Sequence, residues 1–241
     1  VSFVPSTITI NGVEYTIIYG TGPFTTAKWT GVANFMISGF SSVANNALEN
    51  NTTITNVHIG NTVTSIELSA FNGASNLSSV SFESGSQLNN INNNAFNGAT
   101  ALTIIAIHDT VTSIGSSAFR NARRLNSITF GAGSLLITIG ANAFYNTALT
   151  TIAISDTVNS IGTNAFKNTG LTTVILTQNL TIASTTYVIG TSGTFFGAVD
   201  VSFVPSTITI NNVVYTIIYG TGPFQLLDWT AFGSPVNFMI S

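Results

Sequence analysis

The chain contains no cysteine in its 241 residues, so disulfide bonds and thiolate metal sites are excluded. Charge is scarce as well: 5 lysine or arginine and 8 aspartate or glutamate residues make up 5% of the chain, against roughly 25% in average soluble domains. So few basic residues, with a formal net charge of −3, argue against nucleic acid or an anionic membrane as a partner. No run of about 18 apolar residues occurs, so no membrane-spanning helix is predicted.

Apolar residues are abundant at 44%, and threonine, serine, asparagine and glycine supply most of the remainder. Disordered chains are poor in β-branched and aromatic residues, whereas this chain is rich in isoleucine, valine, threonine and phenylalanine. A folded, β-rich protein is therefore predicted. A surface with so little charge suits a protein that packs against copies of itself, or that lies outside the cell in a wall or fibre.

A long internal repeat relates the two ends of the chain. Residues 1–24 return almost unchanged as residues 201–224. Repeats of this kind are typical of arrays in which each unit contacts its neighbours. We therefore predict one solenoid domain over 1–241, in which 1–200 form a complete cassette and 201–241 begin the next copy.

A shorter repeat fills this long period and is marked by a small residue followed by a large apolar one. The marks lie 22 to 30 residues apart, and eight steps complete one period of 200 residues. Because the large residue recurs at the same place in every unit, it is predicted to form a column in the core. The predicted core column comprises Leu48, Phe71, Phe96, Phe119, Phe144, Phe166, Phe196 and Phe224.

Each unit has the same order of elements. A short alternating run, such as residues 105–107, predicts a strand with one buried face. A turn containing Asp or Asn follows, and then a second apolar pair, as in Val111 and Ile114. The Ala-Phe step falls in a short turn or helical piece, introduced by Ser117 or its equivalent as a cap. One unit cannot bury its own apolar side, so stacked units are expected to form a solenoid.

The units resemble the BspA-like (Treponema-type) leucine-rich repeat, whose pattern is approximately L-x-x-I-x-I-P-x-x-V-x-x-I-G-x-x-A-F-x-x-C/N. Residues 102–121 and 149–168 follow this pattern closely, but the proline after the strand and the frequent cysteine are missing there. The resemblance implies a right-handed leucine-rich-repeat stack on the cell surface or outside the cell, used in adhesion and without shared catalytic residues. The period predicts about nine rungs of 22–30 residues, with short strands and short helical or 3-10 turns.

Two stretched segments depart from this regular pattern, at 8–32 and 177–192, and the first of them recurs at 208–232. They contain tyrosines and the two tryptophans, Trp29 and Trp229. We expect longer loops or distorted turns here. The tryptophans either stack on sugars or fill the stretched rungs.

Residues able to carry chemistry are few. His58 belongs to the outward column of the strands and His108 to a turn two rungs away, so both are expected to be exposed and no metal site is predicted. Asp109 and Asp156 occupy equivalent turns, where a neighbouring unit has Asn61, and this favours turn capping over acid-base catalysis. We therefore predict no catalytic residue, no metal ligand and no cofactor.

One basic cluster stands out beside the Phe119 corner. It consists of Arg120, Arg123 and Arg124. The cluster is either a solvated corner or a site for a carboxylate, a sulfated sugar or an acidic group on a neighbouring chain.

Two functional classes fit these observations. The leading hypothesis is a non-enzymatic extracellular structural protein, a segment or subunit of a surface filament whose partners are copies of itself, because no polar capping unit is visible. The alternative is a cell-surface adhesin that binds a host protein or glycan through the solenoid face or the aromatic loops.

Overall fold

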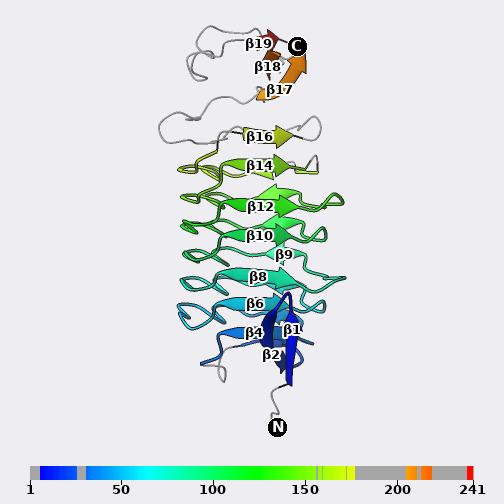
Figure 1. Cartoon of the computed structure of the whole chain (residues 1–241), viewed down its shortest axis with the longest axis vertical. Helices are drawn as coiled ribbons and strands as arrows, with labels where there is room; N and C mark the ends of the chain where they lie inside the picture. The colour runs from blue at the N-terminus through cyan, green and yellow to red at the C-terminus, as the bar shows by residue number, and fades with distance from the viewer. Residues whose placement is uncertain are drawn as a thin grey trace.

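The computed structural model describes residues 6–25, 31–155, 157–158 and 160–171, and the backbone alone of four further strands between residues 173 and 240. In this part of the chain, short strands are stacked one above another along a single long axis (Figure 1). The described residues contain no helix, so none among them is long and apolar enough to cross a membrane. The fold is the predicted β-solenoid.

A wide sheet forms one side of the solenoid and receives one strand from each rung. The strands run parallel and equivalent residues pair with one another, as Ile105 does with Ile128. This register places the apolar residues of successive units on one face, toward the core. The rung strands of the wide sheet are β4 (Asn34–Ser38), β6 (Asn56–Ile59), β8 (Ser79–Phe82), β10 (Ile104–Ile107) and β12 (Ser127–Phe130), followed by the parallel pair β14 (Thr151–Ile154) and β16 (Thr173–Leu176).

A narrow sheet of two-residue strands forms a second side. It has the order β15-β13-β11-β9-β7-β5-β3, all parallel, and the second residue of each strand is buried. In the regular rungs, these residues are the second member of the predicted apolar pair, as Ile114 is, and the first member, Val111, is buried just before β11. The strands are β3 (Pro23–Phe24), β5 (Ser42–Val43), β7 (Ser65–Ile66), β9 (Asn90–Ile91), β11 (Ser113–Ile114), β13 (Thr138–Ile139) and β15 (Ser160–Ile161).

The Ala-Phe corner of each unit is a turn. Of the two predicted alternatives, the short turn is therefore confirmed and the helical or 3-10 piece is wrong. Ser69 and Gly73, on either side of Phe71, have φ of 56° and 70°, in the left-handed region. A right-handed helix cannot pass through such residues. The same pair recurs four residues apart in the other units, at 46 and 50, 94 and 98, 117 and 121, 142 and 146, and 164 and 168.

With these left-handed residues in place, every second backbone N–H of the corner points toward the next rung. The N–H of Phe71 donates to the Ala95 carbonyl at 2.7 Å, and the N–H of Gly73 donates to Asn97 at 2.7 Å. The predicted capping by Ser117 is also wrong, because the corner contains no helix to cap. The N–H of Ser117 belongs to this ladder and donates to Ala141 at 2.8 Å. The corner is therefore a third column of hydrogen bonds, beside the two sheets.

The core column lies inside this corner. Neighbouring rings stack with centroids 5.0 to 5.3 Å apart and planes within 8° of parallel. This spacing is close to the roughly 4.8 Å between strands, so each ring lies on the ring of the next rung with a small offset. Phe196 and Phe224 lie outside the described residues. The column members with 0% exposure are Leu48, Phe71, Phe96, Phe119, Phe144 and Phe166.

The first stretched segment forms a β-hairpin, where a loop or distorted turn was predicted. β1 (Ser6–Ile10) pairs antiparallel with β2 (Val13–Tyr19), and β2 pairs in parallel with β4. Asn11 and Gly12 connect the two strands with φ of 51° and 80°, the positive values that a two-residue type I′ turn requires. The wide sheet therefore runs in the order β1-β2-β4-β6-β8-β10-β12.

The second copy of this sequence pairs in the same way. β17 (Pro205–Ile210) is antiparallel to β18 (Val213–Ile218), which is parallel to β19 (Phe238–Ile240). Ile208 pairs with Tyr215, just as Ile8 pairs with Tyr15. The long sequence repeat is thus a repeat of strand pairing in these segments.

The number of regular rungs within the described residues is smaller than the nine predicted for the whole chain. The seven strands of the narrow sheet bound six complete turns. The difference arises at the stretched segments, because the first begins as a hairpin and residues 177–200 lie outside the described part.

Candidate functional site

The hairpin covers the outer face of the wide sheet at its N-terminal end. β2 contacts β6, although β4 lies between them in the sheet, and Tyr15 lies with its ring centroid 6.0 Å from that of His58. The outward residues Met36 and His58 are consequently only 7% and 6% exposed. The prediction of an exposed His58 is wrong, because its burial depends on a hairpin outside the regular repeat.

Burial of His58 in this position favours its neutral form. Its Nδ1 lies 2.8 Å from the Ser81 hydroxyl. Burial lowers the pKa of His58 below its usual 6.5, and the nearby Glu83 carboxylate only partly opposes this effect. His58 therefore serves packing, and no group of three or more metal-ligating side chains is found among the described residues.

His108 and Asp109 belong to the turn that leaves β10. The Nδ1 of His108 lies 2.9 Å from the Thr110 hydroxyl, which donates to the Leu88 carbonyl at 2.6 Å. These bonds tie the turn to the rung below and bring no second titratable side chain to His108. Asp156, the equivalent of Asp109, lies outside the described residues.

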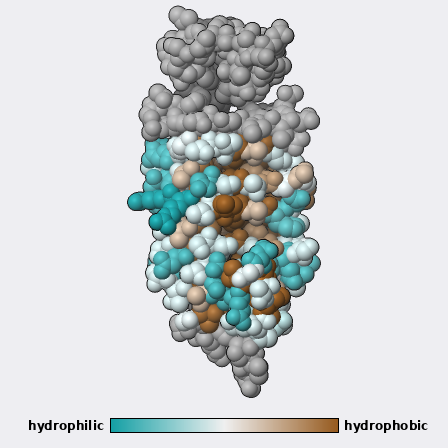
Figure 2. Space-filling view, viewed as in Figure 1, coloured by the Kyte–Doolittle hydropathy of each residue, from teal (hydrophilic) through white to brown (hydrophobic). Residues whose placement is uncertain are grey.

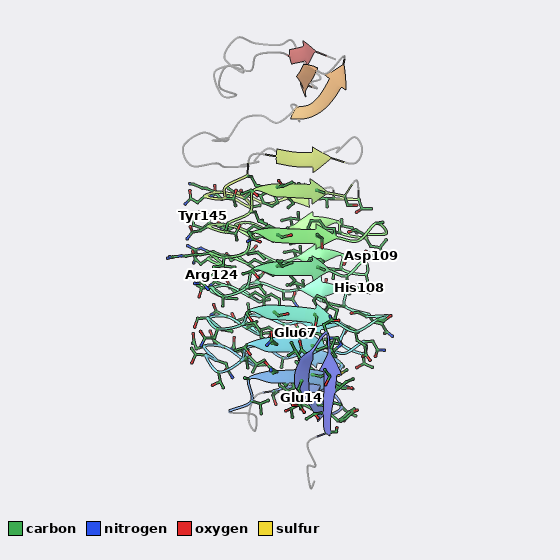
Figure 3. All side chains as sticks on the ribbon, in the orientation of Figure 1. Glu14, Glu67, His108, Asp109, Arg124 and Tyr145 are labelled. Carbon is green, nitrogen blue, oxygen red and sulfur yellow. The ribbon has the colours of Figure 1, made fainter. Side chains whose placement is uncertain are left out.

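The basic cluster lies on the Ala-Phe corner and includes one more residue than the sequence indicated. Arg120 directly follows the core Phe119, and Lys167 occupies the same place two rungs later, after Phe166. Arg123 and Arg124 follow the buried Ala122, and all four cations are exposed. We call Arg120, Arg123, Arg124 and Lys167 the basic edge. Figure 3 shows Arg124 and Tyr145 projecting from the same side of the solenoid, with Asp109 on the other side.

Tyr145 lies between the two ends of the basic edge. The Cζ atom of Arg120 is 5.3 Å from the centroid of the Tyr145 ring, within range of a cation–π contact. The hydroxyl of Tyr145 accepts a hydrogen bond from the Asn168 amide at 3.0 Å. Tyr145 on the next rung, itself hydrogen-bonded to Asn168, thus helps to fix the position of the Arg120 side chain.

Among the described residues, the cations of the basic edge have no acidic partner. Within the described part of the chain, no carboxylate forms an ion pair with any of the four. Glu49, the acid in the same column, lies three rungs below Arg120, where it accepts a hydrogen bond from Asn72 at 2.8 Å. The basic edge is therefore a region of uncompensated positive charge.

Six copies of a known repeat account for most of the chain. Residues 41–172 and 89–194 match the description "BspA type Leucine rich repeat region". The chain belongs to the BspA-type leucine-rich repeat family. None of the curated proteins compared with it matches the sequence.

Two solved structures are similar to this BspA-type chain, and the likeness to the first supports the solenoid fold. The pneumococcal vaccine antigen PcpA has 23% identity and a TM-score of 0.58, over 81% of this chain and 54% of that one. A leucine rich cell surface protein from Faecalibacterium prausnitzii has 20% identity and a TM-score of 0.45, over 91% of this chain and 62% of that one. The chain thus spans little more than half the length of each.

The sequence indicated part of the basic edge of this BspA-type protein. Arg120, Arg123 and Arg124 lie together as a local cluster must, but Lys167 is 43 positions beyond Arg124 and was missed. Alignment of the units was the available signal, because Ala-Phe-Arg at 118–120 and Ala-Phe-Lys at 165–167 are equivalent. Trp29 and Trp229 lie outside the described residues.

Beyond the hairpin, the outer face of the wide sheet is uncovered and partly apolar. Ile104 is 58% exposed, and Ala106 and Ala153 are exposed in the outward column. Figure 2 shows an apolar area in the middle of this side. The face carries short side chains and no charge in β10, β12 or β14.

Proposed function

We propose that this chain is a non-enzymatic extracellular structural protein, a segment of a surface fibre built from 200-residue cassettes in series. The pairing of β17, β18 and β19 supports the proposal, since it repeats the register of β1, β2 and β4. A unit that starts again in the same way can be added many times without a new kind of contact.

The chemistry of the described residues supports a role without catalysis. His58 is covered and neutral, and His108 is engaged in its turn. General acid-base catalysis requires titratable groups that converge on a substrate. Support for a surface location comes from membership of the BspA-type leucine-rich repeat family.

The experiment compares purified proteins with one, two and three cassettes by negative-stain electron microscopy. Eight rungs at about 4.8 Å each lead us to expect straight particles that lengthen by roughly 40 Å per cassette. Sedimentation of the single cassette measures association between separate chains. Particles that bend freely between cassettes, or that keep one length, would contradict a fibre built in series.

A cell-surface adhesin is the second candidate, and the uncompensated basic edge favours it. Cations without internal partners are available to an anionic ligand. Binding of the soluble chain to host proteins or glycans, lost on Trp29→Ala or Arg123→Ala, would support this role. The two roles are compatible, because a fibre can carry binding sites along its length.

A further inference from the structure

The basic edge collects most of the positive charge of the molecule. The chain has 5 lysine and arginine residues in total. Four of them lie on the basic edge, and the fifth, Lys28, lies outside the described residues. A protein with so little charge has therefore placed its cations along one side of a few successive rungs.

These cations do not serve the stability of the solenoid. The side chains of Arg123, Arg124 and Lys167 are exposed and make no ion pair, hydrogen bond or ring contact within the described part of the chain. Arg120 alone contacts another side chain, the ring of Tyr145. Since exposed cations without partners add little to folding free energy, their grouping points to a ligand.

The arrangement suits an extended ligand with several negative groups. Arg120 and Lys167 occupy one column two rungs apart, roughly 10 Å along the axis at about 4.8 Å per rung. Arg123 and Arg124 widen the edge beside Arg120. A single small anion reaches one or two of these groups, whereas an anionic chain parallel to the axis reaches all four. The planar guanidinium groups match the oxygens of sulfate and carboxylate.

Between residues 117 and 122, the corner offers no free backbone N–H to a peptide strand, because each of these N–H groups already donates a hydrogen bond. The N–H of Asn121 donates to the Tyr145 carbonyl at 2.9 Å, and the N–H of Arg120 donates to Ser117 at 3.1 Å. Strand addition requires free backbone groups, whereas residues 117–122 use their N–H groups within the turn and toward the next rung. This observation favours a ligand recognised by its charges and side groups.

Asparagine side chains run beside the cations and provide neutral polar groups. The amide of Asn146 donates to the Asn121 oxygen at 3.0 Å, and the amide of Asn168 donates to Tyr145. Each contact uses one donor, so amide groups of this column remain available to hydroxyl groups of a ligand. Hydroxyl groups between regularly spaced anions are the chemistry of acidic polysaccharides.

We propose that the basic edge binds a sulfated or carboxylated polysaccharide that lies along the solenoid axis. The site adds a ligand class to the fibre proposed above and does not depend on fibre formation. The cations supply attraction and the corner ladder keeps them in register.

The test measures binding of the full chain to immobilised heparin, a highly sulfated polysaccharide, by surface plasmon resonance at about 0.15 M salt. The double variant Arg123→Gln/Arg124→Gln is expected to bind about tenfold more weakly or worse, and Lys167→Gln to bind more weakly than wild type. Wild-type binding should fall steeply as salt is raised, since screening acts on exposed charges. The melting temperature of each variant should stay unchanged.

The matched control is Gln87→Glu/Asn89→Asp, which changes the net charge by the same −2 at exposed positions on the turn before β9. It is expected to bind heparin as the wild type does. Failure of the wild type to bind, equal binding by the Arg123→Gln/Arg124→Gln variant, or equal loss in the control would each overturn the proposal. Stronger competition by poly-glutamate than by soluble heparin would also overturn it and indicate an acidic peptide. Heparin binding by a chain that forms no fibre would separate this site from the proposed fibre.

Discussion

A phenylalanine in the middle of the core column contacts the ring above and the ring below, so one side chain contributes to three rungs. Phe119 stacks on Phe96 at 5.2 Å and on Phe144 at 5.3 Å. Phe119→Ala is expected to lower the free energy of unfolding by about 3–5 kcal/mol, because it leaves a cavity and removes both ring contacts. Phe119→Leu should cost less, since Leu48 already occupies this column. Urea denaturation measures both, and equal stability of the alanine variant would contradict the packing described.

His58 links stability to pH at the residue scale. Its pKa is lowered in the folded protein by burial, so the unfolded chain binds the proton more readily. The stabilisation is therefore complete above pH 6.5, the usual value, and is lost as the pH falls through the lower folded value. We expect the melting temperature to fall more steeply below this point in the wild type than in His58→Gln. His108→Gln serves as the control and should keep the wild-type profile.

At the scale of the element, the conformation of the Ala-Phe corner depends on residues that tolerate positive φ. Ser117 has φ of 57° and Asn142 has φ of 55°. The left-handed region costs an ordinary residue about 1–2 kcal/mol, asparagine less and glycine nothing. Ser117→Gly is thus expected to raise the melting temperature and Asn142→Ala to lower it, each by the equivalent of about 1 kcal/mol. Changes of the same sign in both variants would contradict this account of the corner.

The elements of the regular rungs were predictable from sequence, whereas those outside the repeat were not. Alternation at residues 105–107 and the spacing of the Ala-Phe steps predicted the strands and the stack. The corner was misassigned because serine and asparagine are typical both of helix caps and of left-handed residues. A second such residue four positions later, as at Asn121, was the signal that separates the two.

The hairpin and its consequences were missed for a different reason. Asn11-Gly12 between alternating segments is a strong hairpin signal, but the repeat pattern assigned this region to loops. The burial of His58 then followed from contacts between segments 43 positions apart, Tyr15 and His58, that no local pattern encodes. A site made by residues from different rungs, such as Lys167 with Arg120, can be predicted from sequence only after the repeat units have been aligned with one another.

The whole molecule is held together with almost no charge. No ion pair is present within the part of the chain that the structure describes, and the rungs are joined by backbone ladders and an apolar core. We therefore expect the midpoint of thermal unfolding to change little between low and physiological salt, because there is no exposed pair to screen. Calorimetry at several salt concentrations measures this. A marked loss of stability with salt would point to ion pairs beyond the described residues.

The corner ladder also gives the stack a direction. Its inter-rung N–H groups all point toward the C-terminal rungs, as those of Phe71, Phe96 and Phe119 do, whereas hydrogen bonds in the parallel sheets run both ways. Amide dipoles aligned in this manner add up, as they do along a helix, and leave donors at one extremity and acceptors at the other. Joining two such stacks is therefore electrically favourable head to tail and unfavourable head to head.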